Sequence, residues 1–119
     1  MGLTTDTLTI IKNSVLKEIF DTFTHVSFGT GTTAFQEGDT DLEFSLVTVA
    51  RQEAGTFTSS IIVSGFLTNS QQNGHTITEI GAREGSTGTL RSRNIIDGIV
   101  KTSSVEAWVD IETTVTVTQ

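Results

Sequence analysis

The stretch from Val105 to Val117 places the strongest constraint on the fold, because its character alternates at every residue. The odd positions read Val, Ala, Val, Ile, Thr, Val, Val, and the even positions read Glu, Trp, Asp, Glu, Thr, Thr. A period of two in β-branched residues is typical of a strand that is buried on one face and solvated on the other. Fully extended, such a strand would span about 40 Å at about 3.3 Å per residue, which exceeds the usual strand length. We therefore predict a strand with a bulge or bend near Thr113.

The composition favours an all-β domain. The chain has 119 residues, which suits a single domain spanning residues 1–119, and it contains 23 Thr and 11 Ser but no Pro, Tyr or Cys. Threonine fits a pleated, half-buried surface better than a helix. The absence of cysteine from the sequence excludes disulfides and thiolate metal sites. Stability must therefore come from packing or from partners.

The charge of the chain and its lack of long apolar runs limit the classes of partner that the chain can bind. The formal net charge is −7 with seven Lys plus Arg. Nucleic-acid affinity depends on neutralising phosphates with cations, so we expect no nucleic-acid partner. The start of the sequence has no basic segment followed by an apolar run, and we expect neither a signal peptide nor a membrane span.

One helix is predicted, over residues 7–22. Its apolar residues recur at spacings of three and four, as on one face of a helix. They are Leu8, Ile11, Val15 and Ile19, with Leu16, Phe20 and Phe23 adjoining. We interpret this stripe as core packing onto a sheet rather than as a partner-binding face.

The first half of the β region contains two predicted strands and a long loop. A strand begins at Thr24 and runs into a loop over residues 29–41 that is rich in turn formers. Loops of this length are uncommon in compact domains and are often functional. We expect Phe35 to pin the loop to the body of the protein. The next strand starts at about Ser45, with a register break near Leu46.

The second half contains a doubly apolar segment and a hairpin. Residues 56–68 carry apolar residues on both faces, which predicts a central or doubly covered strand, and Gly65 marks a bulge or a close approach. Residues 76–83 and 89–94 are predicted to form a hairpin. Residues 95–104 are interpreted as a loop with an apolar lip. The lip consists of Ile95, Ile96, Ile99 and Val100. The predicted fold is mainly β, an antiparallel β-sandwich with one N-terminal α-helix.

A search for chemistry yields no catalytic or metal site. Neither His25 nor His75 lies in a pattern of metal ligands. The acidic residues of the segment 37–43 alternate, but their order differs from that of a calcium loop, and we interpret them as solvated. We expect no enzymatic activity and no cofactor. Arg91 and Arg93 are predicted to point the same way and, with other basic residues, to meet carboxylates of another subunit.

Two short motifs carry a resemblance to a known group of proteins. Thr24 to Thr32 reads THVSFGTGT, within a similar stretch that extends to Leu42, and Ile77 to Arg83 reads ITEIGAR, within a stretch from Asn73 to Arg93. Together with the closing alternating strand, these segments resemble tail-collar fibre and tail-fibre-like proteins of tailed phages and archaeal tailed viruses. Such chains often carry an apolar pair where this one has Ala82 and Arg83, and many continue into a long fibre.

The resemblance implies a structural protein of a virus particle, an adaptor, short spike base or decoration subunit on the tail, neck or capsid surface. Its expected partners are copies of itself, with a trimer favoured, and other virion proteins; its expected location is the virion. The residues expected at interfaces are Phe35, Ile95, Ile96, Ile99, Val100, Trp108, Arg91 and Arg93. The alternative is a carbohydrate- or surface-binding β module, with or without a calcium requirement, which would use Trp108 beside Asp110 and Glu112.

Overall fold

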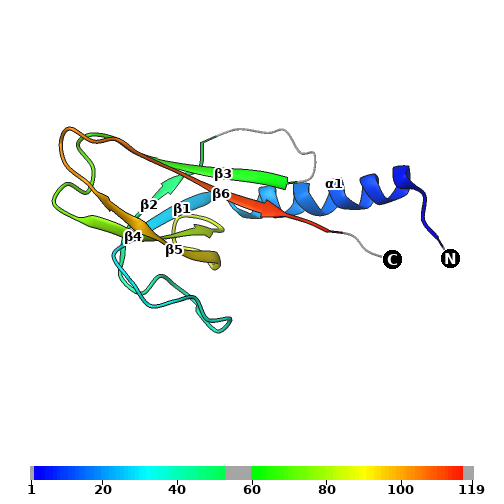
Figure 1. The fold of residues 1–119 in the computed structure, drawn as a ribbon, viewed down its shortest axis with the longest axis horizontal. Helices are drawn as coiled ribbons and strands as arrows, with labels where there is room; N and C mark the ends of the chain where they lie inside the picture. Colours follow the sequence, from blue (N-terminus) through cyan, green and yellow to red (C-terminus); the bar gives the residue numbers. More distant parts are fainter. Residues whose placement is uncertain (1, 53–59, 117–119) are drawn as a thin grey trace.

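The computed structural model describes residues 2–52 and 60–116 of the chain. Its elements are, in chain order, α1 (Thr5–Thr22), β1 (His25–Gly29), β2 (Ser45–Ala50), β3 (Ser60–Leu67), β4 (Thr76–Arg83), β5 (Leu90–Val100) and β6 (Ala107–Thr114). The strands form a four-stranded sheet in the order β2-β1-β4-β5 and a two-stranded sheet of β3 and β6, all with antiparallel pairing (Figure 1). The predicted fold, a mainly β sandwich with one N-terminal helix, is confirmed.

The alternation predicted within the stretch from Val105 to Val117 is confirmed in β6. In β6 the side chains of Ala107, Val109 and Ile111 are buried, whereas the residues between them are exposed. The strand, Ala107–Thr114, is shorter than the predicted stretch. Its pairing with β3 is regular through Thr113 and Thr114, so the bulge or bend predicted near Thr113 is wrong. Val117 lies outside the described residues.

The core lies between the two sheets. Its buried apolar side chains come from α1 and from every strand except β2 and β5. Gly65 of β3 lies over β1, where a Cβ atom would come within 2.6 Å of Val26 and 3.1 Å of Phe28. The β3 register is regular at this position, so of the two predicted roles for Gly65 the close approach is the correct one.

The position predicted for β3 is wrong. Within the described residues, β3 pairs along its length with β6 alone and is joined to the other sheet only through the isolated bridge between Gln52 and Ser64. Its second apolar face is not covered as predicted: Ile62 is exposed. The part of the prediction that falls on residues 56–59 lies outside the described chain.

A register break occurs in β2, as predicted. Val47 faces Phe28, but Ser45 faces Gly29, so Leu46 is the extra residue. Such a bulge bends the strand. It lies where the chain leaves the loop of residues 30–44 and enters the sheet.

The expected loop over residues 95–104 is instead largely strand. β5 continues to Val100 and pairs with β4, Ile99 facing Ile77 and Val100 facing Thr76. The Asp97-Gly98 dipeptide, which resembles a turn in sequence, lies opposite a register shift in the β4–β5 ladder. A Cβ atom on Gly98 would lie 2.8 Å from Thr76, so the glycine serves a close cross-strand contact rather than a turn.

Helix α1 begins at the N-cap Thr4, whose hydroxyl accepts a hydrogen bond from Thr7 N–H at 3.3 Å. At its C-terminal end, Arg51 donates hydrogen bonds to the carbonyls of Phe20 and Phe23, and its guanidinium lies 3.6 Å from the Phe20 ring centroid. A cation is favourable at this end of the helix dipole. Within the described chain, no helix has the length and apolar character needed to cross a membrane.

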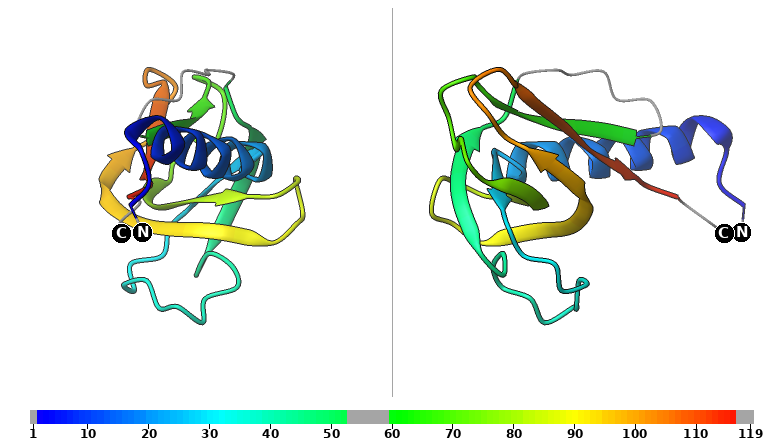
Figure 2. Two further views of the ribbon diagram at one scale, coloured as in Figure 1. Left: turned by 90° about the vertical axis from the view of Figure 1, so that its right-hand side faces the viewer. Right: turned by 60° about the vertical axis from the view of Figure 1, so that its left-hand side comes forward.

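The molecule is elongated, because α1 extends beyond the sheets. Its extents are 56 × 29 × 24 Å and its radius of gyration is 16.0 Å, against roughly 13.5 Å for a compact domain of this length. Figures 1 and 2 show the C-terminal half of the helix against the sheets and the N-terminal half projecting past the ends of β3 and β6. Only Leu16 and Phe20 of the helix are buried, so the predicted apolar stripe is used for packing in its C-terminal part alone.

Candidate functional site

The loop of residues 30–44 covers the outer face of the four-stranded sheet and is held there by a buried carboxylate. Glu79 lies on β4 and its side chain is 0% exposed. Its Oε2 accepts hydrogen bonds from the backbone N–H groups of Gly31 (2.6 Å) and Phe44 (2.8 Å), and its Oε1 accepts one from Glu43 N–H (2.9 Å). One side chain therefore ties both ends of the loop to the sheet.

Arg93 of β5 provides the countercharge. Its Nε donates to Glu79 Oε1 at 2.9 Å, and its Nη1 lies 3.2 Å from Asp39 Oδ2 in the loop. The Arg93 side chain is 2% exposed. Four donors thus surround the Glu79 carboxylate, as a buried charge requires.

Opposing effects set the ionisation of this pair. Burial raises the pKa of Glu79, but the hydrogen bonds from Phe44 N–H, Arg93 and the other two backbone donors outweigh it, so the pKa lies below its usual value. For Arg93, burial lowers the pKa, but the bond to Glu79 and the nearby carboxylates raise it overall. Glu79 is therefore held as a carboxylate at neutral pH.

A second ion pair holds the middle of the loop. Arg83 of β4 is hydrogen bonded through Nη2 to Asp41, through Nε to Ser27 Oγ (2.9 Å) and through Nη1 to Gly88 O (3.1 Å). The hydrogen bond from Arg83 lowers the pKa of Asp41. Next to it, the buried Leu42 fills the space left by Gly81, where a Cβ atom would lie 3.1 Å from Leu42 Cδ2.

The two sequence motifs meet in this cluster. The segments from Thr24 to Thr32 and from Ile77 to Arg83 contribute β1 and β4, which pair side by side with Gly29 facing Glu79. A Cβ atom on Gly31 would overlap the Glu79 carboxylate. The contact between the loop backbone and Glu79 therefore explains why one motif has a glycine at position 31 and the other a glutamate at position 79.

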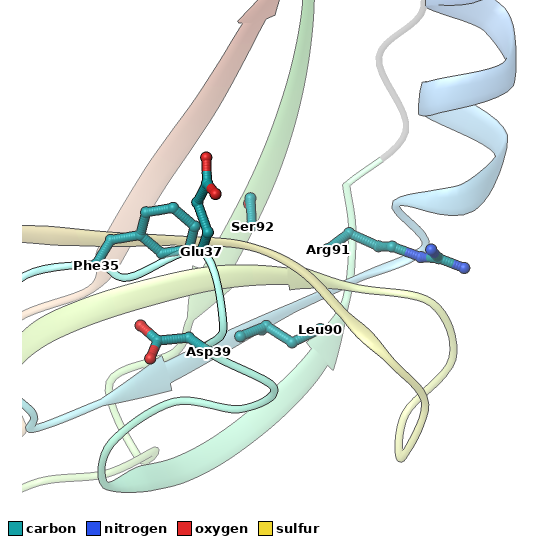
Figure 3. A pocket seen from close by; sticks show the side chains of 6 residues that line it. All are labelled: Phe35, Glu37, Asp39, Leu90, Arg91 and Ser92. Atoms are coloured by element: carbon teal, nitrogen blue, oxygen red, sulfur yellow. The ribbon is translucent and has the colours of Figure 1, made fainter.

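Two small hollows lie between the loop and β5. The first, of about 130 Å³, is lined by Phe35, Glu37, Asp39, Leu90, Arg91 and Ser92 (Figure 3). The second, of about 160 Å³, is lined by Thr33, Ala34, Asp39, Asp41, Glu43 and Arg93. Phe35 is half exposed at the rim of the first, so the anchor of the loop is Glu79 and not Phe35, contrary to our prediction.

The acidic residues of the loop, which we interpreted as solvated, form ion pairs and hydrogen bonds within the chain. Asp39 and Asp41 form ion pairs with Arg93 and Arg83, and Glu43 accepts hydrogen bonds from Thr32 N–H and Thr33. The bonds from Thr33 and Thr32 lower the pKa of Glu43. Among the residues described, no three His, Asp or Glu side chains come together in an arrangement suited to a metal ion.

Arg91 and Arg93 do not act as a pair. A register shift leaves Arg91 as the extra residue between Leu90, which faces Arg83, and Ser92, which faces Ala82. Arg91 consequently points outward (Figure 3) and is bound to Glu84 at 2.5 Å. Arg93 instead contacts Glu79 and Asp39 under the loop. Both meet carboxylates of their own chain, and a role for either in contacts between subunits stays a prediction.

The remaining predicted interface residues lie on separate surfaces. Ile95 and Val100 are exposed on β5, an edge strand, while Ile96 and Ile99 are half buried against the core. Trp108 is exposed on the outer face of the β3–β6 sheet. The structure therefore does not bring these residues into one site.

Sequence reasoning missed Glu79. An isolated glutamate on a strand resembles a solvated residue, and its three backbone partners lie 35 to 48 positions earlier in the chain. Charged residues at alternate positions, such as Glu79 and Arg83, are typical of a solvated strand face, so no local signal marked Glu79 as buried. No protein-family model and no curated protein matches this chain.

Proposed function

We propose that this chain is a structural component of a virus particle, a tail, neck or capsid-surface subunit that acts by self-assembly and by docking to other virion proteins. The motif resemblance supports this proposal. So does the chemistry of the loop cluster, whose buried charged side chains are hydrogen bonded to backbone groups and to one another.

The observation that carries the proposal is the uncovered apolar surface of helix α1. Ile10 is 65% exposed and Ile11 is also exposed, both on the half of the helix that projects beyond the sheets (Figure 1), and Val15 is exposed one turn further along. Large apolar side chains grouped on an exposed surface are typical of protein–protein contacts. The helix does not need these residues to pack on its own sheets, since Leu16 and Phe20 do so.

The edge of the four-stranded sheet offers a second contact surface. β5 is an edge strand of 11 residues with Ile95 and Val100 exposed. Proteins usually protect such edges, because unpaired backbone groups beside apolar side chains recruit other strands. In a symmetric assembly, this edge and the helix would each meet a neighbouring copy.

Sedimentation velocity at high micromolar concentration tests self-assembly. The wild-type chain is expected to form a homo-oligomer, with a trimer favoured, and the double variant Ile10→Ser/Val15→Ser is expected to sediment as a folded monomer. Phe44→Ser is the matched control, because it also removes an exposed apolar side chain but lies in the loop. A wild-type chain that remains a clean monomer would contradict the proposal.

The virion role needs a separate measurement. Quantitative mass spectrometry of purified virions is expected to detect the chain at a fixed copy number. A handful of copies would assign it to the tail tip or neck, and hundreds would assign it to capsid decoration or a tail tube. Its absence from purified particles would refute the virion role even if the chain self-assembles.

A further inference from the structure

The outer face of the β3–β6 sheet carries an exposed indole ring. Trp108 is the sole tryptophan of the sequence and is 55% exposed. Its cross-strand partner is Phe66, and the exposed Ile62 lies further along the same face of β3. Phe66 and Ile62 are four residues apart with Ser64 between them, so this face is about 13 Å long at about 3.3 Å per residue, with polar side chains between its apolar ends.

Neighbouring side chains fix the orientation of the indole. Its Nε1–H donates to Asp110 Oδ1 at 2.8 Å, and the same oxygen accepts a hydrogen bond from Ser64 Oγ at 2.5 Å. The Phe66 ring lies against it with centroids 5.8 Å apart and planes inclined by 56°. An aromatic ring held in this way loses little conformational entropy when a ligand stacks on it.

The charges around the ring select the ligand. Asp110 and Glu112 lie on the same face as Trp108, and neither β3 nor β6 contains Lys or Arg. With a net charge of −7 on the chain, phosphates and anionic sugars are repelled, which excludes stacking of a nucleic acid. A second copy of the chain docking symmetrically would bring the same two carboxylates to the contact.

We propose that Trp108 is the platform of a binding site for a neutral oligosaccharide. The C–H groups on one face of a pyranose ring carry partial positive charge and stack on the negative face of the indole. The hydroxyl groups at the edge of the sugar donate hydrogen bonds to the carboxylates of Asp110 and Glu112. The length of this face accommodates more than one sugar ring.

Because Trp108 is the single tryptophan, its fluorescence reports on this site directly. We would titrate the full chain with neutral hexasaccharides of glucose, mannose and N-acetylglucosamine, and with a galacturonate oligomer as the anionic comparison. At least one neutral probe is expected to change the emission saturably and to protect it from acrylamide, whereas galacturonate leaves it unchanged.

Isothermal titration then locates the site. Trp108→Ala is expected to weaken binding at least about tenfold, while Trp108→Phe keeps part of the affinity because it retains a ring. Phe44→Ala, which removes an exposed aromatic ring from another surface, is expected to bind as wild type. Circular dichroism verifies that each variant is folded.

Three outcomes would overturn the inference. They are the absence of a saturable change with any neutral probe at millimolar concentration, equal affinity in folded Trp108→Ala, and an emission change that follows protein concentration alone. The last would assign this face to a contact between copies of the chain. None of these outcomes bears on whether the chain is present in virions.

Discussion

Arg93 and Glu79 form a hydrogen-bonded ion pair of 2.9 Å whose two side chains are both almost completely removed from solvent. The pair joins β5 to β4 and, through the backbone donors on Glu79, joins both strands to the loop of residues 30–44. Breaking a buried pair costs far more than the pair itself contributes, since one charge is left without its partner.

Substitution of Glu79 is expected to destabilise the protein more than substitution of Arg93. In Glu79→Gln, the amide NH₂ must face two donors in either orientation, because each carboxylate oxygen accepts two hydrogen bonds. We expect a loss of about 3–5 kcal/mol in the free energy of unfolding. Arg93→Met should cost less, because Glu79 keeps three backbone donors and because Arg93 Nη2 is buried without a hydrogen-bond partner in the described part of the chain. Urea denaturation measures both; a larger cost for Arg93→Met would contradict this account of the site.

The glycine at the centre of the contact is expected to be intolerant of a side chain. A Cβ atom on Gly31 would overlap Glu79 Oε2 and Glu43 Cβ, so Gly31→Ala must displace the loop from the sheet. We expect a destabilisation of about 1–3 kcal/mol. Gly38→Ala is the matched control in the same loop, because no atom lies within 4 Å of the added methyl group. Equal thermal unfolding curves for the two variants would show that the loop is not held at Gly31.

Acid is expected to destabilise the fold through the carboxylates with lowered pKa values. Asp41 and Glu79 have folded pKa values below their ordinary values of 3.8 and 4.5, so the unfolded chain binds more protons as the pH falls. Their contribution to stability is complete above about pH 5 and is lost as the pH falls through the folded values. Protonation at low pH also makes the net charge of −7 less negative, which reduces self-repulsion and stabilises the folded chain. Asp41→Asn serves as the reference, because it has the same background but lacks the Asp41 carboxylate. The urea midpoint of wild type should fall more steeply than that of Asp41→Asn as the pH falls through 3.8, the ordinary pKa of Asp41; parallel curves would show that the Asp41 carboxylate does not contribute.

Local sequence patterns were sufficient to predict much of the fold. The burial of β6, the helix, the β4–β5 hairpin and the break at Leu46 each depend on alternation or periodicity within a few residues, which the sequence displays directly. The extension of β5 through Asp97 and Gly98 was missed because a turn-forming dipeptide can also serve a close contact within a sheet.

The candidate site could not be predicted in the same way. The loop is anchored by contacts between residues far apart in the chain, and Glu79 has no local neighbour that distinguishes it from a solvated glutamate. The bulge at Arg91 has a similar consequence, since one extra residue separates two arginines that strict alternation places together. Trp108 is a different case: its exposure depends on whether another element covers the β3–β6 sheet, which no pattern within β6 determines.

The two halves of α1 are expected to respond differently to the same kind of change. Leu16 is fully buried against the core, whereas Ile10 is exposed on the projecting half of the helix. Leu16→Ala removes buried methyl groups and leaves a cavity, which we expect to cost about 2–5 kcal/mol. Ile10→Ala removes little packing within the chain, because Ile10 is 65% exposed, and alanine is the better helix former, so its effect on an isolated monomer should lie within about 0.5 kcal/mol. Urea denaturation at low protein concentration measures these monomer values.

Repeating the denaturation at high protein concentration separates the stability of the fold from that of the assembly, because an oligomer that uses the helix is stabilised by mass action. Ile10→Ala should reduce that gain in stability. A cost for Ile10→Ala as large as that for Leu16→Ala at low concentration would show that the projecting half of α1 belongs to the core after all.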